Sequence, residues 1–152
     1  MNYASKSFIS STFWSERIGY VAGLSCLETM EQNKSWEYVT KFGKKIKKSW
    51  SNLANKYDLL IEIYGLDALP SFLINSPNFS KYKTYITQEM LKHGYLASNS
   101  VYVSTAHKNK DLIIYLKILD KIFENIKKCE EGLDIATLLE GPVCESGFKR
   151  IN

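Results

Sequence analysis

The chain has 152 residues, enough for one domain with its own hydrophobic core. Hydrophobic residues make up 45% and aromatic residues 13%, which excludes the disordered class, because that class is poor in aromatics. The net charge of +4 comes mainly from lysine pairs such as Lys44-Lys45 and Lys127-Lys128. We favour a solvated helix face over a nucleic-acid patch, since no DNA- or RNA-binding signature accompanies these lysines.

The cysteines and the N-terminus indicate the compartment. Cys26, Cys129 and Cys144 are far apart and form no C-x-x-C pair, which favours neither a disulfide framework nor a zinc site. The N-terminus lacks the pattern of a signal peptide, and no apolar run approaches the roughly 20 residues that span a bilayer. We therefore expect a cytoplasmic protein with reduced thiols, without a metal, and without membrane or nucleic-acid partners.

Two helices are predicted first. Residues from 18 to about 32 have Val21, Leu24, Leu27 and Met30 along one side. Ser35 can cap a second helix through its hydroxyl. The apolar positions of that second helix recur at steps of three and four, a strong amphipathic pattern that predicts a buried stripe, and they are Trp36, Val39, Gly43, Ile46, Trp50 and Leu53.

Short strands and two more helices follow. Residues 59–64 and 69–74 are predicted to form an antiparallel pair, with Pro70 near the start of the second strand, where a missing donor is tolerated. Residues 75–80 are a predicted loop, 84–93 a helix that stops at Gly94, and 101–104 a third strand. The clearest helix covers 111–129, and its apolar face consists of Leu112, Leu116, Leu119, Ile122, Phe123 and Ile126. A short helix is predicted near 135–139.

This order of elements predicts the fold class. Two helices, two strands, a helix, a strand and a helix favour an α+β fold, in which a small antiparallel sheet of about three strands is covered by helices. No internal repeat or low-complexity segment is present.

Several motifs resemble one enzyme family. Class III aminotransferases, which depend on pyridoxal phosphate (PLP), often show a Gly-Thr pair, then an Asn-Pro pair, then a helix of small residues. At the matching positions this sequence has Ser11-Thr12, then Glu16-Arg17, then Gly19-Tyr20-Val21-Ala22-Gly23-Leu24. Gln88-Glu89-Met90-Leu91-Lys92-His93-Gly94 and Ser104-Thr105-Ala106-His107 resemble later segments of the glutamate-1-semialdehyde aminomutase branch. The resemblance runs roughly over residues 8–123. The departures at Ser11, Glu16 and Arg17 put the substrate in doubt.

The resemblance implies a C-terminal part of a fold-type I PLP enzyme. In that family a lysine amine holds PLP and the cofactor is the electron sink for amino-group transfer. The resemblance places this lysine well upstream of Thr12, which has eleven residues before it. We therefore expect residues 1–17 to be a remnant of the large-domain segment and 18–152 to be the small domain with its connecting helix. Such a chain would have no catalytic residue of its own and would be inactive alone.

Thr12 is the candidate cofactor-binding residue. In the family the matching threonine reaches the PLP phosphate, typically that of the neighbouring subunit, and a hydroxyl near a helix start suits a phosphate. The alternative is that Thr12 only caps the following helix. Glu16 and Arg17 form an internal ion pair or face the substrate. His93 and His107 lack a metal-ligand partner at suitable spacing, so helix-end and surface roles are favoured.

The partners follow from the resemblance. It implies a homodimer or a missing large domain, and a small-molecule amino donor and acceptor in the intact enzyme. A different class of function stays open: a non-catalytic dimerisation or complementation module for a separate large-domain chain. A third possibility is a gene fragment without a function of its own.

Overall fold

A computed structural model describes Lys6 and residues 16–145. The contacts divide the chain into two units, Met1–Ser35 and Trp36–Asn152, and each is considered by itself. Thr12, Ser11 and the rest of the motif that precedes Glu16 lie outside the described residues.

The first unit contributes one helix, α1 (Arg17–Asn33), as the apolar pattern predicts. Glu16 is its N-cap residue, and Lys34 ends it in the left-handed conformation, with φ 46° and ψ 46°. None of the helix's 17 residues is buried. Val21, Leu24 and Leu27 are each more than 60% exposed, so this helix is held by local backbone bonds and not by a core.

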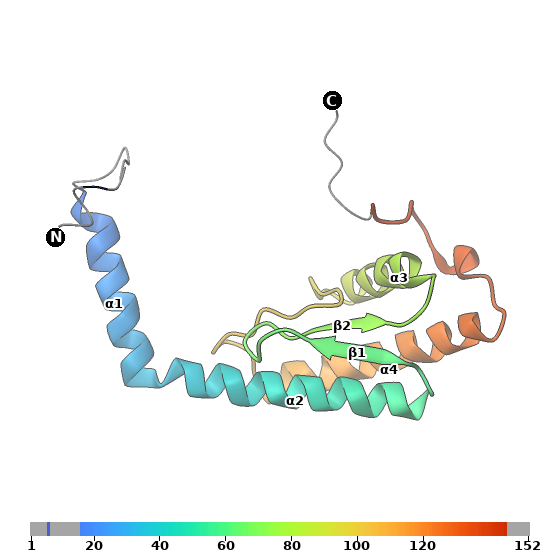
Figure 1. Cartoon of the computed structure of the whole chain (residues 1–152), viewed down its shortest axis with the longest axis horizontal. Coiled ribbons are helices and arrows are strands. Elements are labelled where there is room, and N and C mark those ends of the chain that lie inside the picture. The colour runs from blue at the N-terminus through green and yellow to red at the C-terminus, as the bar shows by residue number, and fades with distance from the viewer. Residues whose placement is uncertain (1–5, 7–15, 146–152) are drawn as a thin grey trace. The chain divides into compact units, whose positions relative to one another are not determined.

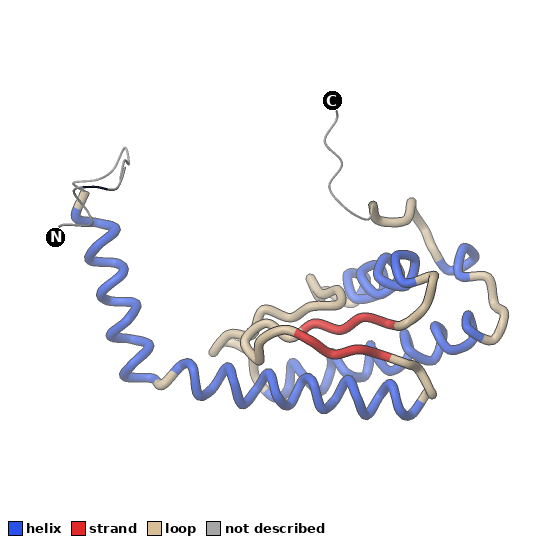
Figure 2. Tube along the Cα trace, viewed as in Figure 1, coloured by secondary structure: helices blue, strands red, loops and turns tan. Residues whose placement is uncertain are grey.

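The second unit holds the core and the remaining elements (Figures 1 and 2). They are the helix α2 (Ser35–Lys56), the strands β1 (Ile61–Tyr64) and β2 (Ser71–Ile74), the helices α3 (Phe79–Lys92) and α4 (Asn109–Glu130), and the 3₁₀ turn η2 (Ile135–Leu138). The described residues thus form a helix-rich α+β fold with four α-helices and a two-stranded antiparallel sheet. The predicted α+β class is confirmed, and the sheet is one strand smaller than expected.

The buried face of α2 begins later than its apolar pattern suggests. Phe42, Gly43, Ile46, Trp50 and Ala54 are buried, whereas Trp36 is 47% exposed. The expectation that Trp36 and Trp50 share one core stripe is wrong for Trp36, because the core cluster meets α2 only from Phe42 onward. Ser35, the predicted cap, is the first residue of the helix, after the left-handed Lys34.

The two strands pair in the predicted antiparallel manner. Ile61 lies opposite Ile74 and Ile63 opposite Phe72, and these four apolar residues belong to the core or pack against it. Because side chains alternate across a strand, Glu62 and Tyr64 fall on the other face and are exposed. One buried face and one exposed face fix the register of the pair.

The predicted third strand, 101–104, is not a regular strand. The chain from Asn99 to Val103 does run along β2: Phe72 N–H donates to Asn99 O (2.9 Å), Val101 N–H to Pro70 O (3.0 Å) and Val103 N–H to Ala68 O (3.0 Å). Pro70 has no N–H to donate in return, and Phe72 O accepts from the side-chain Nδ2 of Asn99 (3.0 Å). Only one isolated bridge, Ser71 with Ser100, therefore forms.

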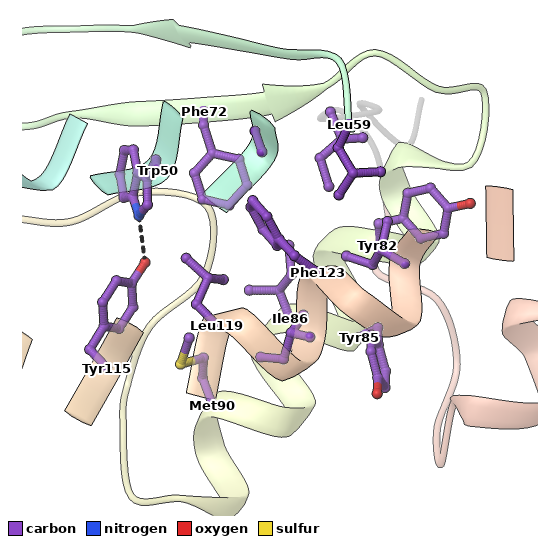
Figure 3. Close-up of a cluster of buried hydrophobic side chains, with 14 of the residues drawn as sticks. Trp50, Leu59, Phe72, Tyr82, Tyr85, Ile86, Met90, Tyr115, Leu119 and Phe123 are labelled. Carbon is purple, nitrogen blue, oxygen red and sulfur yellow. Dashed lines mark hydrogen bonds between the residues drawn. The ribbon is translucent and has the colours of Figure 1, made fainter. Parts of the chain in front are cut away.

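The core lies where α2, the sheet, α3 and α4 meet (Figure 3). Trp50 of α2 stands edge-on to Phe72 of β2 (ring centroids 4.8 Å apart), and Phe72 stands edge-on to Phe123 of α4 (5.7 Å). Such edge-to-face contacts are favourable beyond the area they bury. These aromatic side chains join three elements that are distant in sequence.

Helices α2 and α4 run in the same direction. Lys45 bonds to Asn109, Trp50 to Tyr115 and Lys56 to Asp120, at sequence separations of 64, 65 and 64 residues. A constant separation requires parallel helices in fixed register. The β-hairpin, α3 and the segment after it form the return path between them (Figure 1).

The helices α3 and α4 form where helices were predicted, but α3 begins earlier than expected. α3 starts at Phe79, inside the predicted loop; Pro77 lies just before the N-cap Asn78, outside the helix, so it does not interrupt the helix. Gly94 ends this segment with φ +79°, the left-handed stop that was predicted. The apolar face of α4 is buried as expected, except that Tyr115 is buried and Leu116 only partly so. No helix in the described part of the chain is long and apolar enough to cross a membrane.

Candidate functional site

A cavity of about 360 Å³ lies between α2, the segment that follows α3, and the start of α4. Phe42 and Ile46 of α2 form one wall, and Leu112 and Tyr115 of α4 form another. Its rim includes Tyr102, which is 78% exposed, so the cavity reaches the surface. The cavity lies wholly within the second unit.

Aromatic rings dominate the lining. Phe42 and His107 are stacked, with centroids 6.1 Å apart and planes at 18°, and Tyr38 extends this stack on Phe42 (5.8 Å, 17°). Tyr95 and Tyr115 form a tilted pair with centroids 6.2 Å apart. With Tyr102, the rings that line the cavity are Phe42, Tyr95, Tyr102, His107 and Tyr115.

Tyr115 joins the cavity to the core. Its hydroxyl accepts a hydrogen bond from Trp50 Nε1 (3.0 Å), and both residues are buried (Figure 3). Burial raises the pKa of Tyr115, against a smaller opposing effect of the hydrogen bond from Trp50. Tyr115 therefore stays a neutral phenol at ordinary pH and is a rigid part of the cavity.

Asp111 gives the cavity a negative charge. Its Oδ2 accepts the backbone N–H of Lys108 (2.9 Å), which caps α4, and its carbonyl accepts the hydroxyl of Tyr95 (3.2 Å). Burial and then the charge of Asp111 raise the pKa of Tyr95. Among the described residues, no lysine or arginine lines the cavity. The formal charge of this described lining is therefore negative, in a chain whose net charge is +4.

The orientation of His107 follows from one contact. The backbone N–H of Ser104 donates to His107 Nδ1 (3.1 Å), so in the neutral ring we assign the proton to Nε2. His107 directly precedes Lys108, the N-cap of α4, which agrees with the helix-end position expected for it, and its ring is half-buried on Phe42. His93 is exposed at the C-cap of α3 and does not line the cavity.

The other sequence candidates do not join this site. Thr12 lies outside the described residues, so its contact with a phosphate stays a prediction. Glu16 and Arg17 are exposed at the start of α1, in the other unit. All three cysteines are described and are free thiols. Among the described residues, no group of three or more His, Cys, Asp or Glu side chains could hold a metal ion.

The sequence analysis did not single out Tyr95, Tyr102, Asp111 or Tyr115 as a site. Three of them are rings within the segment from Tyr95 to Tyr115, which also contains His107, and that local density of aromatics is the only signal in the sequence. Their convergence with Phe42 depends on the parallel register of α2 and α4, which no local pattern reveals.

No protein-family model matches the sequence. No curated protein matches it either. The structure is similar to that of the FumI protein of Sphingopyxis sp. MTA144, solved in its PLP internal aldimine form, with a TM-score of 0.73 and 16% sequence identity. The likeness covers 91% of this chain and 34% of that one, so this chain spans about a third of the length of FumI. At this identity the likeness shows the fold alone: the chain has the fold of part of a PLP enzyme.

The described cavity does not fit PLP. The cofactor needs a lysine amine for its aldimine and a positive environment for its phosphate, whereas the lining offers no lysine and places the Asp111 carboxylate at the start of α4. A carboxylate at that helix start repels a phosphate. We therefore assign no PLP chemistry to the described residues.

Proposed function

We propose that this chain is the C-terminal, small-domain part of a PLP-dependent enzyme that resembles class III aminotransferases and transfers amino groups. The observation that carries the proposal is the likeness to about a third of FumI, which extends over 91% of this chain. The motif series from Ser11-Thr12 to His107 supports the same family and the aminomutase branch within it.

In this proposal the chain contributes residues at the edge of an active site, and the residues that hold PLP and carry out the reaction lie outside this chain. PLP, when bound by the intact enzyme, is the electron sink for amino-group transfer. Thr12 would contact the phosphate, typically across a dimer, and the small-molecule amino donor and acceptor would bind in the intact enzyme. The chain alone would not turn over substrate.

The first experiment measures covalent cofactor binding by the chain. The purified chain is incubated with PLP, reduced with borohydride, and analysed by intact mass and peptide mapping. We expect no stoichiometric adduct at a single site, because the cavity lining that the structure describes contains no lysine. A single, stoichiometric adduct at one lysine would show that this chain has its own PLP site.

A second experiment tests the family itself. The DNA ahead of Met1 and elsewhere in the same genome is searched for a reading frame with the PLP lysine, and that product is co-expressed with this chain. We expect an aldimine absorbance band in the complex, and weaker PLP binding when Thr12→Ala is introduced. A co-purified pair without any PLP band would contradict the proposed enzyme.

The alternative function is a non-catalytic module that completes a separate large-domain chain or forms a dimer. One observation favours it: α1 has no buried residue, and its apolar side chains, such as Leu24 (62% exposed), are uncovered. Size-exclusion chromatography with light scattering separates the cases. A strictly monomeric chain that does not bind the large-domain product would exclude this alternative.

A further inference from the structure

We propose that the cavity between α2 and α4 binds a small organic cation, with aromatic rings as its walls and Asp111 as its anionic group. This inference is independent of the PLP enzyme proposed above, because it uses only residues 42–115 and no cofactor. Either proposal can fail while the other stands.

The walls have the chemistry that recognises a cation. Each aromatic ring presents a negative face, and a cation within about 6 Å of several rings is attracted to all of them. Tyr95, Tyr102 and Tyr115 line one space together with Phe42, whose own ring is stacked on those of Tyr38 and His107. Such an arrangement of rings is the usual way in which proteins bind quaternary ammonium groups.

The charge of the lining points the same way. Asp111 brings a carboxylate, and the described residues that line the cavity include no lysine or arginine. The nearby ammonium of Lys108 is engaged elsewhere, since it donates to Thr105 O (3.0 Å) and lies over the ring of Tyr38 (5.9 Å). A negative charge among the lining residues favours a cation over a neutral or anionic ligand.

The cavity is also the right kind of space. Its volume of about 360 Å³ is at the lower end of cavities that hold small organic ligands, roughly 300–1,000 Å³. Tyr115 is fixed by the hydrogen bond from Trp50, and Phe42 by the stacked ring of His107. Two walls are therefore rigid before any ligand enters, which lowers the entropic cost of binding.

The test uses choline chloride as the probe and 3,3-dimethylbutan-1-ol as its neutral isostere. Each is titrated into the full chain, and binding is followed by NMR shifts of the tyrosine ring protons. We expect saturable binding of choline, and binding of the alcohol that is weaker by about tenfold or more, the difference that charge makes at an aromatic site. Equal binding of the two probes, or no saturable shift with choline, would overturn the proposal.

Variants locate the binding in the cavity. Tyr102→Ala removes an exposed ring, so it spares the core, and we expect it to weaken choline binding about tenfold. Asp111→Asn keeps an oxygen that can accept the Lys108 N–H but removes the charge, and we expect a similar loss. Tyr64→Ala, which removes an exposed tyrosine outside the cavity, is the matched control and should bind choline normally. If Tyr102→Ala and Asp111→Asn both bind choline as tightly as the unaltered chain, the cavity is not the site.

Discussion

At the scale of single residues, Gly43 sets how closely α2 approaches the β-hairpin. A Cβ atom built at this position would lie 1.7 Å from the carbonyl oxygen of Asp67, in the link between β1 and β2. The neighbouring Lys47 reaches the same link, with its ammonium 2.9 Å from Asp67 Oδ1 and 2.8 Å from Gly65 O. The backbone of the hairpin link therefore rests directly on the helix, and only glycine permits this contact.

We predict that Gly43→Ala destabilises the chain. The clash is with a backbone atom, so the hairpin itself must move, and we expect a loss of about 3 kcal/mol in the free energy of unfolding, at the upper end of overpacking costs. Urea denaturation measures the loss. Gly141→Ala is the control, since a Cβ there meets no heavy atom within 4 Å. Equal stability of the two variants would show that the hairpin does not rest on Gly43.

At the scale of elements, α3 holds the C-terminal tail with one row of side chains. Thr84, Gln88 and Lys92 follow each other at steps of four, which places them on one face of the helix. Gln88 donates to Leu138 O (2.9 Å) and accepts the N–H of Glu140 (2.8 Å), and Thr84 Oγ1 accepts the N–H of Cys144 (2.9 Å). Lys92 adds an ion pair with Glu140 (2.6 Å). The tail is thus bound mainly through its backbone.

We predict that Gln88→Ala releases the tail but leaves the core folded. Gln88 provides both hydrogen bonds to the 138–140 backbone, and each is worth about 1 kcal/mol. Hydrogen exchange should show faster exchange of the Glu140 amide, by about tenfold or more, while amides of α4 stay protected. Gln32→Ala, at an exposed position of α1, is the control. Unchanged exchange at Glu140 in the Gln88 variant would contradict this role.

The sequence predicts the existence of the elements better than their limits or partners. The helices 18–32 and 111–129 and the pair of strands are present because their apolar periodicity is long or clear. The predicted third strand, 101–104, does not form as a regular strand, because a ladder needs N–H donors from both paired segments, and Pro70 supplies none. The sequence failed to predict that Trp36 is exposed, because a periodic pattern identifies the apolar face of a helix but not where along the helix the core begins.

At the scale of the whole molecule, buried tyrosines make the stability of the fold depend on pH in the alkaline range. Burial, followed by the hydrogen bond to Glu130, raises the pKa of Tyr82, and burial raises the pKa of Tyr85 and Tyr115. A folded-state pKa above the unfolded value means that the neutral phenol is stabilised by folding. That stability is fully present below the unfolded pKa of about 10 and is lost as the pH rises through the folded value.

We therefore predict that the free energy of unfolding falls steadily as the pH rises above about 10. Urea titrations across this range, with tyrosinate absorbance as a second signal, measure the decline. Tyr82→Phe should reduce the slope, because it removes one of the shifted groups, whereas Tyr64→Phe on the exposed face of β1 should not. A stability that stays level up to pH 11 would contradict this account of the core.

The candidate site is the part of the molecule that the sequence predicts least. Thr12, the one site residue predicted, rests on the family resemblance, and a helix-end or surface role was expected for His107. The cavity instead combines Phe42 with Tyr95 and Tyr115, residues that come together only because α2 and α4 are parallel and in register. Long-range register depends on packing of the whole core, which local periodicity does not specify.

The parallel arrangement of α2 and α4 has a consequence for how a cell makes this protein. The hydrogen bonds from Lys45 to Asn109 and from Lys56 to Asp120 each join residues 64 positions apart. A ribosome adds about 5–20 residues per second, so the apolar face of α2 waits roughly 3 to 13 s after its own synthesis for its partner to be made. Throughout that interval Phe42, Ile46 and Trp50 have no α4 to pack against. The emerging chain therefore exposes this apolar face until α4 has been made, the kind of transient exposure that chaperones cover.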